Sequence, residues 1–214
     1  MNNLIIIGAS GFGKEVAWAV ERMNKENPTW NMLGFIDDNE ALTGKRINGY
    51  SVLGTTSIIG QYQDAYYVCA VGSARIREII VNRITKEYPG IKFGTVIDPS
   101  AVISEYVRMG EGVIICAHTI ITVNVVIGDH VIINLDCTVG HDAVIEDYVT
   151  MYPSVNLSGN TVTKRCTELG TGMQVIQGIT IGEHTIVGAG AVVVKDIPDR
   201  CTAVGNPAKP IKYH

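Results

Sequence analysis

One histidine of the sequence, His141, is followed directly by a carboxylate, Asp142. Imidazole titrates near neutral pH, so it can take a proton from an attacking amine or hydroxyl while a neighbouring carboxylate orients the ring. Acyl transfer from a thioester needs such a base, and it also needs a backbone N–H group that stabilises the oxyanion. Gly159 lies further along the chain and has no side chain to cover its amide. These residues predict a general-base site for acyl transfer; the alternative is that His141 is a surface histidine without a task.

The other candidate nucleophiles and bases fit structural roles better. His118, His130 and His184 share one position of the repeat described below, where a solvated side chain is expected. His214 is the last residue of the sequence. Cys137 falls at an inward-facing position of the same repeat, so we expect a small core residue there and no acyl-enzyme nucleophile.

A glycine-rich loop, residues 8–14, allows three interpretations. A phosphate-binding P-loop is excluded because Glu15 stands where Ser or Thr must hold magnesium. A dinucleotide fingerprint needs glycine at the third position of the motif, where Ser10 stands. The third interpretation is a half-site for one nucleotide, with loop amides and a helix N-terminus facing a phosphate. We favour this site over the alternative, in which the glycines only permit a tight turn.

The loop belongs to a predicted Rossmann-like domain over residues 1–92. The pattern predicts strands over residues 4–7, 32–36 and 66–71 and helices over residues 14–25 and 74–88. Ligands bind at the carboxyl ends of the strands in such a unit. Asp37 and Asp38 follow the second strand and can accept a hydrogen bond from a ribose or a base; otherwise they form a solvated turn.

The elements that position His141 lie in a stretch with a period of six residues. Seventeen positions at this spacing run from Ile97 to Val193, and all but Thr163 are aliphatic or Met. A second set, four residues after the first, contains no charged residue. This period matches neither a helix nor a simple alternating strand, and it predicts a hexapeptide β-solenoid over residues 93–214. Three hexapeptides make one triangular coil, so His141 and Gly159, eighteen residues apart, are expected to stack.

Composition excludes several classes of protein. The net charge is −4 without a basic block, which argues against nucleic-acid binding through phosphate contacts. No apolar run approaches a membrane span, and no signal sequence precedes the first strand. The five cysteines lack CxxC spacing, so free thiols and a cytoplasmic location are expected, and no metal site is predicted.

The order of these motifs resembles the sialic acid O-acetyltransferase and bacillosamine N-acetyltransferase family. The glycine loop, the segment 34–38, the segment 70–72 and the hexapeptides follow one another as they do in that family. The resemblance implies a left-handed parallel β-helix, acetyl-CoA as cosubstrate, a UDP- or GDP-linked amino sugar as acceptor, and a homotrimer with acetyl-CoA in the groove between prisms. Two departures affect the nucleotide site: Phe12 replaces a usual histidine, and Ser73-Ala74 follows Gly72 in place of the usual asparagine.

The resemblance also assigns roles to residues of this chain. His141 matches the catalytic base and Asp142 the residue that orients it, while Thr150 stands where many members carry a second histidine. The expected coenzyme contacts are Thr150, Gly159, Thr171 and Ala189. The expected substrate contacts are Gly8, Ser10, Gly11, Phe12, Asp37, Asp38 and Gly72. The segment 205–209 resembles the closing motif near the nucleotide end of coenzyme A.

The leading prediction is thus an acetyl-CoA-dependent N-acetyltransferase of a nucleotide-linked amino sugar. O-acetylation of sialic acid or another sugar hydroxyl is the alternative within the same class. A hexapeptide carbonic anhydrase would need converging histidines, two of them five residues apart, and no pair here has that spacing. A non-enzymatic trimeric scaffold is the remaining alternative, against which the glycine loop and His141-Asp142 argue.

Overall fold

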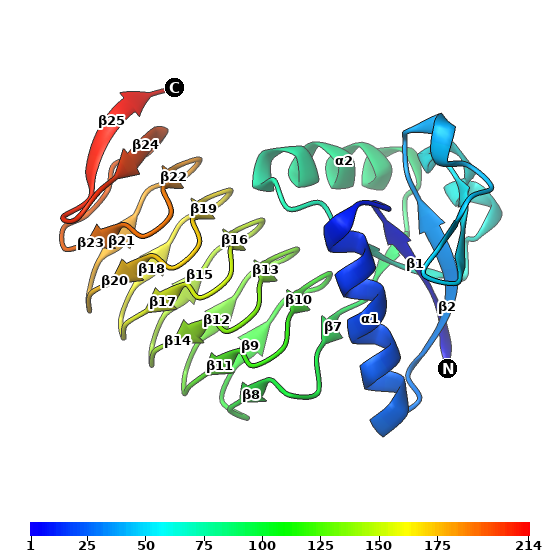
Figure 1. Ribbon diagram of the computed structural model, residues 1–214, viewed down its shortest axis with the longest axis horizontal. Helices are drawn as coiled ribbons and strands as arrows, with labels where there is room; N and C mark the ends of the chain where they lie inside the picture. Colours follow the sequence, from blue (N-terminus) through cyan, green and yellow to red (C-terminus); the bar gives the residue numbers. More distant parts are fainter.

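The computed structural model describes residues 1–214 and contains an α/β sheet beside a long triangular prism (Figure 1). The sheet has six strands in the order β3-β4-β2-β1-β5-β6. Their bounds are β1 Asn2–Ile7, β2 Trp30–Ile36, β3 Arg46–Ile47, β4 Tyr50–Gly54, β5 Tyr66–Cys69 and β6 Lys92–Phe93. Strand β1 pairs in parallel with both β2 and β5, and residues 4–7 are buried, as expected for a central strand covered on both faces.

The hairpin of β3 and β4 was not predicted. Its strands are joined by Asn48 and Gly49, which both have positive φ, +47° and +86°. An Asn-Gly pair is the usual sequence of such a two-residue turn, so the signal was present in the sequence. Strand β4 continues the sheet in parallel beyond β2.

Two helices accompany the sheet. Helix α1, Gly11–Glu26, starts directly after the glycine loop and ends before Pro28. Helix α2, Ala74–Glu87, ends before the Pro89-Gly90 pair, and its buried residues include Arg77, Val81 and Ile84, which share one face. Short 3₁₀ turns occupy Glu40–Leu42 and Thr56–Gln61. Neither α-helix has the length and apolar character that a bilayer crossing requires.

The prism is a left-handed parallel β-helix, as the hexapeptide period and the family resemblance predict. The first face consists of β7 Val96–Ile97, β10 Ile114–Ile115, β13 Ile132–Ile133, β16 Thr150–Met151, β19 Glu168–Leu169, β22 Ile186–Val187, β24 Cys201–Val204 and β25 Lys209–Tyr213. The second face consists of β8 Val102–Ile103, β11 Ile120–Ile121, β14 Thr138–Val139, β17 Asn156–Leu157, β20 Gln174–Val175 and β23 Val192–Val193. The third face consists of β9 Arg108–Met109, β12 Val126–Ile127, β15 Val144–Ile145, β18 Val162–Thr163 and β21 Thr180–Ile181.

The interior of the prism is built from the two predicted sets of hexapeptide positions. From Ile115 to Val193 the first set is buried, and from Val113 the second set is buried too. Cys137 belongs to this interior and is 0% exposed, so it is a core residue as expected. Each coil hydrogen-bonds to the next through registered pairs such as Thr138 with Asn156, which keeps residues eighteen apart in line along the prism.

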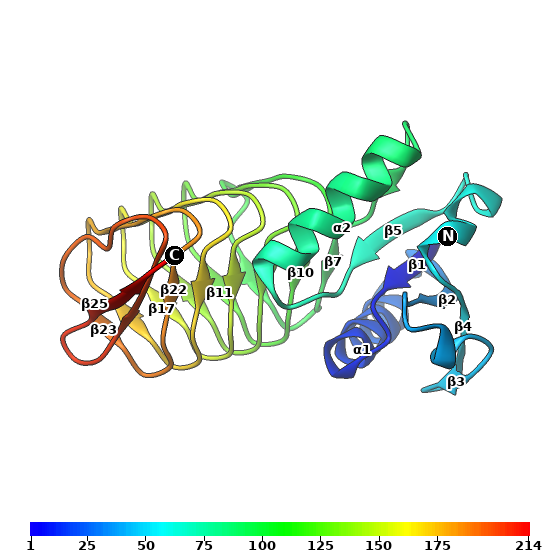
Figure 2. The same cartoon turned by 90° about the horizontal axis from the view of Figure 1, so that it is seen from above.

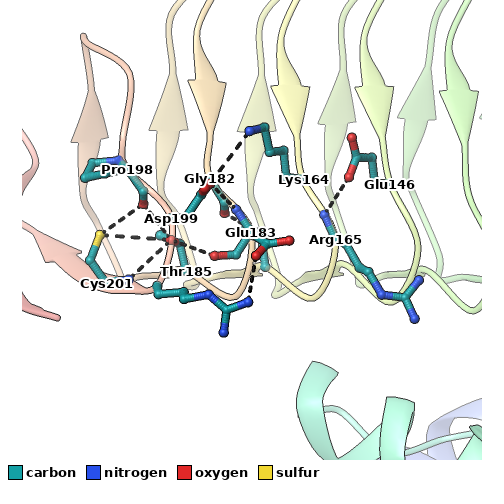
Figure 3. Close-up of polar contacts among 11 residues, drawn as sticks. Glu146, Lys164, Arg165, Gly182, Glu183, Thr185, Pro198, Asp199 and Cys201 are labelled. Carbon is teal, nitrogen blue, oxygen red and sulfur yellow. Dashed lines mark hydrogen bonds and ion pairs between the residues drawn. The ribbon is translucent and has the colours of Figure 1, made fainter. Parts of the chain in front are cut away.

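We name the corners by the faces they join. The first corner joins the first and second faces, the second corner the second and third faces, and the third corner the third face and the first face of the next coil. Carboxylates reinforce the third corner by accepting from backbone amides of neighbouring coils. Glu146 accepts from the Arg165 N–H at 2.9 Å, and Asp199 accepts from the Glu183 N–H at 2.9 Å (Figure 3).

Helix α2 extends over the coils of the β-helix and connects the two parts of the molecule at the third corner (Figures 1 and 2). Arg77 of α2 is 1% exposed and donates to the carbonyl oxygens of His130, 2.9 Å away, and Tyr148, 2.7 Å away. Burial lowers the pKa of Arg77 to about 10. This guanidinium therefore ties α2 to two successive coils.

The expectation that His130 is solvated is wrong. Its ring is 4% exposed, lies edge-on to Phe93 at 4.5 Å and stacks on Tyr148 at 5.1 Å between ring centres. Burial lowers the pKa of His130 to about 4. The fourth hexapeptide position points outward from the prism, but at this corner the α/β domain covers it.

Candidate functional site

His141 and Asp142 lie at the second corner, between β14 and β15. The Nδ1 atom of His141 is 2.8 Å from Oδ2 of Asp142, and the His141 side chain is 52% exposed. This contact is a hydrogen bond when Nδ1 carries the proton, which leaves the lone pair of Nε2 free. The hydrogen bonds from His141 and from the Asn124 amide, at 3.1 Å, lower the pKa of the Asp142 carboxyl. The geometry therefore suits a ring that accepts a proton at Nε2.

The structure brings Gly159 directly beside this ring. A Cβ atom on Gly159 would lie 2.5 Å from His141 Nε2, so no residue with a side chain fits there without moving the imidazole. The coil register holds the two together, because the Asn160 N–H donates to the His141 carbonyl at 2.8 Å. The Gly159 N–H donates no hydrogen bond within the chain. The His141 imidazole, a possible base, thus lies beside the Gly159 N–H, a backbone donor without an acceptor in the chain.

Exposed apolar residues continue along the same corner below His141. Val123, one coil before His141, is 41% exposed, and Tyr106, one coil earlier at the same corner, is 63% exposed. We call these two residues, with the exposed Val102, Ile120 and Val126 of the adjoining faces, the second-corner patch. Such a patch is typical of a contact surface.

Two of the expected coenzyme contacts lie at another corner. Thr171 and Ala189 are both exposed and follow β19 and β22 at the first corner. The Gly190 N–H donates to the Thr171 carbonyl at 2.8 Å, which shows that these segments stack one coil apart. Within a single chain, the second face of the prism separates them from His141.

Thr150, an expected coenzyme contact, is buried where the two parts of the chain meet. Its side chain is 1% exposed, its hydroxyl donates to the Gly72 carbonyl at 2.7 Å, and it accepts from Arg77 Nη2 at 2.9 Å. The Thr150 hydroxyl is therefore enclosed in the contact between α2, the Gly72 loop and the first face.

The glycine loop has the form of a tight strand-to-helix connection. Gly8 has a φ of +102°, and a Cβ on Gly13 would overlap the Gly8 carbonyl oxygen. Ser10 precedes α1 without a side-chain capping bond, and Gly11 has open space where a Cβ would project. Phe12 is half-buried and packs against the core of this domain. The loop can therefore admit an anion at the N-terminus of α1 while Gly13 permits close packing.

Asp37 and Asp38 line a cavity of about 130 Å³ at the carboxyl end of the sheet, together with Gly8. Asp37 accepts from the Ala9 N–H at 2.9 Å, which couples it to the glycine loop. Asp38 accepts from Arg83 Nη2 at 2.6 Å and from both the backbone and hydroxyl of Thr56. Partial burial would raise the pKa of Asp38, but these hydrogen bonds outweigh it and lower the pKa.

The residues that anchor the Gly72 loop were not singled out from the sequence. Glu168 Oε1 accepts from Ser73 Oγ at 3.1 Å and from the Ala74 N–H at 2.9 Å. Tyr152 donates its hydroxyl to the other oxygen of Glu168 at 3.0 Å. Glu168 lies on the first face, and Tyr152 lies at the first corner. Both occupy outward positions of the repeat, and nothing in the hexapeptide pattern distinguishes them from solvated residues.

Comparison with known proteins identifies relatives of both parts. The family described as "PglD N-terminal domain" matches residues 3–84. The GDP-perosamine N-acetyltransferase of Escherichia coli O157:H7 is 32% identical over 220 residues, which cover 99% of this chain and 97% of the relative.

Solved structures agree over nearly the whole chain. The acetyltransferase domain of PglB from Neisseria gonorrhoeae, in complex with acetyl coenzyme A, matches with a TM-score of 0.88 and 34% identity, covering 98% of this chain and 99% of that one. A second match is a His→Asn mutant of perosamine N-acetyltransferase from Caulobacter crescentus, in complex with CoA and GDP-perosamine. Its TM-score is 0.88 and its identity 31%, and the match covers 98% of this chain and 97% of that one. The chain therefore belongs to the hexapeptide-repeat sugar acyltransferase family, whose members include these acetyltransferases.

Proposed function

We propose that the protein transfers an acetyl group from acetyl-CoA to the amine of a nucleotide-linked amino sugar, with His141 as general base. The observation that carries the proposal is the His141-Asp142 pair stacked on Gly159, in a chain that aligns from end to end with a GDP-perosamine N-acetyltransferase. GDP-perosamine, the sugar of that relative's activity and of the Caulobacter crescentus complex, favours a GDP-linked sugar over a UDP-linked one.

The orientation of the His141 ring, with Nε2 free to accept a proton, supports the following reaction. The sugar amine attacks the thioester carbonyl and forms the C–N bond, and Nε2 of His141 takes a proton from the nitrogen. Asp142 accepts from Nδ1 at 2.8 Å and stabilises the imidazolium that results. In this proposal the Gly159 N–H, which has no acceptor within the chain, donates to the oxyanion of the tetrahedral intermediate. Collapse of the intermediate breaks the C–S bond, and the proton leaves with the thiol of coenzyme A.

The nucleotide is assigned to the carboxyl end of the sheet. The amides at the start of α1 suit a phosphate, and Asp37 retains acceptor capacity for a ribose or base hydrogen. Asp38 is assigned mainly to positioning, because Arg83 and Thr56 already occupy its oxygens. Gly72 lies beside Tyr152, which belongs to the first corner of the β-helix. A sugar that extends from the bound nucleotide past Gly72 would therefore point toward the first corner.

The separation of the corners supports a homotrimer. His141 and Gly159 lie at the second corner, whereas Thr171, Ala189 and the Gly72 loop lie at or near the first. A second copy that packs its second-corner patch against the first corner would complete a groove from residues of both chains. Acetyl-CoA in that groove would reach Nε2 of one copy along Thr171 and Ala189 of the other.

Replacement of His141 by Asn tests the general base. Asn keeps much of the size of the ring and cannot accept the proton, so kcat with GDP-perosamine should fall by about 10²- to 10⁴-fold. Acetyl-CoA affinity, measured by calorimetry, should stay the same. The wild-type product should carry a hydroxylamine-stable N-acetyl group. Wild-type kcat in a trimeric, folded His141→Asn protein would show that another residue is the base.

A further inference from the structure

A groove of about 620 Å³ lies between α2 and the last coils, along the third corner and the first face, whereas His141 lies at the second corner. It is lined by residues of the third corner and of α2, among them Glu78, Cys166 and His184. The proposed acetyl transfer uses none of these three residues. The N-terminal cavity with Asp37 is a separate space.

The fold brings three metal-binding side chains together in this groove. Cys166 and His184 occupy the same position of successive coils, eighteen residues apart, so the register stacks them. Helix α2 places Glu78 over them, with Glu78 Oε2 at 3.1 Å from Cys166 Sγ. One ligand atom from each residue lies within 4.8 Å of the other two.

We propose that Glu78, Cys166 and His184 form a binding site for Zn²⁺. A thiolate, an imidazole and a carboxylate are the ligand types that Zn²⁺ takes in proteins, with a solvent molecule as the fourth ligand in open sites. Bond lengths of about 2.0–2.3 Å place tetrahedral ligand atoms about 3.3–3.8 Å apart, so the atoms that now lie up to 4.8 Å apart must approach by about 1–1.5 Å. The open side toward the groove supplies the path for the ion and its water.

The surroundings of the cluster support this assignment. Arg165 donates to Glu78 Oε1 at 2.6 Å and leaves Oε2 directed at Cys166. A partner on the second oxygen orients a ligating carboxylate. The His184 ring makes no hydrogen bond to the protein, so a nitrogen lone pair is free for the ion.

Binding also has a defined proton balance. Cys166 Sγ donates a hydrogen bond to Glu78 Oε2 at 3.1 Å, so the sulfur carries a proton in this arrangement. Coordination replaces the S–H bond by a Zn–S bond, and one proton passes to solvent for each ion bound. The ion would tie α2 to two coils and add to the stability of the domain contact.

Metal titration of the full-length, tag-free protein tests the site. Zn²⁺ is titrated against a chromophoric chelator, and Co²⁺ is titrated while the thiolate charge-transfer band in the near ultraviolet is recorded. We expect one ion per chain, a thiolate band with Co²⁺, and a rise in Tm of about 5 °C at saturating Zn²⁺. Absence of the band with excess Co²⁺ would overturn the proposal.

Two variants and a matched control localise the ion. His184→Asn and Cys166→Ser should each weaken Zn²⁺ binding by more than about 100-fold, because loss of a ligand exceeds the loss seen for outer partners. His118→Asn is the control, since His118 holds the same repeat position, with a similar positive φ, at another corner. Equal Zn²⁺ affinity of the His184→Asn and His118→Asn proteins would also refute the proposed site. The wild-type Co²⁺ spectrum decides the question even if a variant fails to fold.

Discussion

The carboxylate of Glu168, on the first face of the β-helix, accepts a hydrogen bond of 2.9 Å from the backbone N–H of Ala74, the first residue of α2. A negative charge at a helix N-terminus is favourable, because the first amides of a helix lack intrahelical partners. The same carboxylate is held by Tyr152, whose pKa is raised to about 12 by burial and by the Glu168 charge. The β-helix thus supplies the cap of the helix that follows the Gly72 loop.

Replacement of Glu168 by Gln should raise the KM for the nucleotide sugar by about tenfold or more, because hydrogen bonds to a charged group are worth about 1.5–3 kcal/mol. The KM for acetyl-CoA should change little. Asp98→Asn is the comparison, since it breaks another bond between the two parts, to Arg22, without touching the loop. Equal changes in both variants would indicate a general loss of domain contact.

Replacement of Gly159 by Ala should lower kcat by about 100-fold, because the new Cβ would lie 2.5 Å from His141 Nε2 and displace the ring. Ser158→Ala is the adjacent control, because the Ser158 side chain is exposed. Steady-state kinetics at saturating substrates check both variants. A fully active Gly159→Ala enzyme would show that the ring position beside Gly159 is not the reactive one.

Replacement of Gly11 by Leu should raise the KM for the nucleotide sugar and leave Tm unchanged, because the side chain enters open space before α1. Gly13→Ala provides the contrast. Its Cβ would overlap the Gly8 carbonyl oxygen, so overpacking should cost about 1–3 kcal/mol of stability. Thermal unfolding and kinetics separate the two effects. An unchanged KM in Gly11→Leu would place the phosphate elsewhere.

Replacement of Asp142 by Asn should lower kcat less than His141→Asn does, because it affects only the orientation and charge stabilisation of the ring. The backbone should tolerate the change, since Asp142 has a φ of +59° and Asn also adopts this region. Parallel measurement of kcat in both variants checks the order. A larger loss in Asp142→Asn would assign the proton transfer to the carboxylate.

Buried His130 should make stability depend on pH. Its pKa is about 4 in the folded protein against 6.5 in the unfolded chain, so the unfolded state binds the extra proton between these values. Stability is therefore full above about pH 6.5 and falls as the pH drops toward 4, by about 3 kcal/mol in total. Urea unfolding at pH 5 and 7.5 should show this difference in the wild type and a smaller one in His130→Asn.

The sequence by itself determined the β-helix and the pairing at the second corner. A period of six forces one inward residue per strand, and three strands per coil place Gly159 beside His141 without any further information. The alternation of an aliphatic strand, glycine loop and helix likewise predicts the N-terminal sheet. These features rest on local periodicity, which a single sequence carries. The β3–β4 hairpin is local too, since its Asn48-Gly49 pair is the usual sequence of a two-residue turn.

Only the tertiary structure decided what happens where the two parts meet. Thr150, Glu168 and His130 all occupy outward positions of the repeat, and the hexapeptide pattern predicts solvent or ligand around them. The α/β domain covers them instead, so Thr150 bonds to Gly72, Glu168 caps α2 and the His130 ring is buried against Phe93. These contacts join residues far apart in the chain, and they depend on the shape of two finished surfaces. No local period encodes that fit.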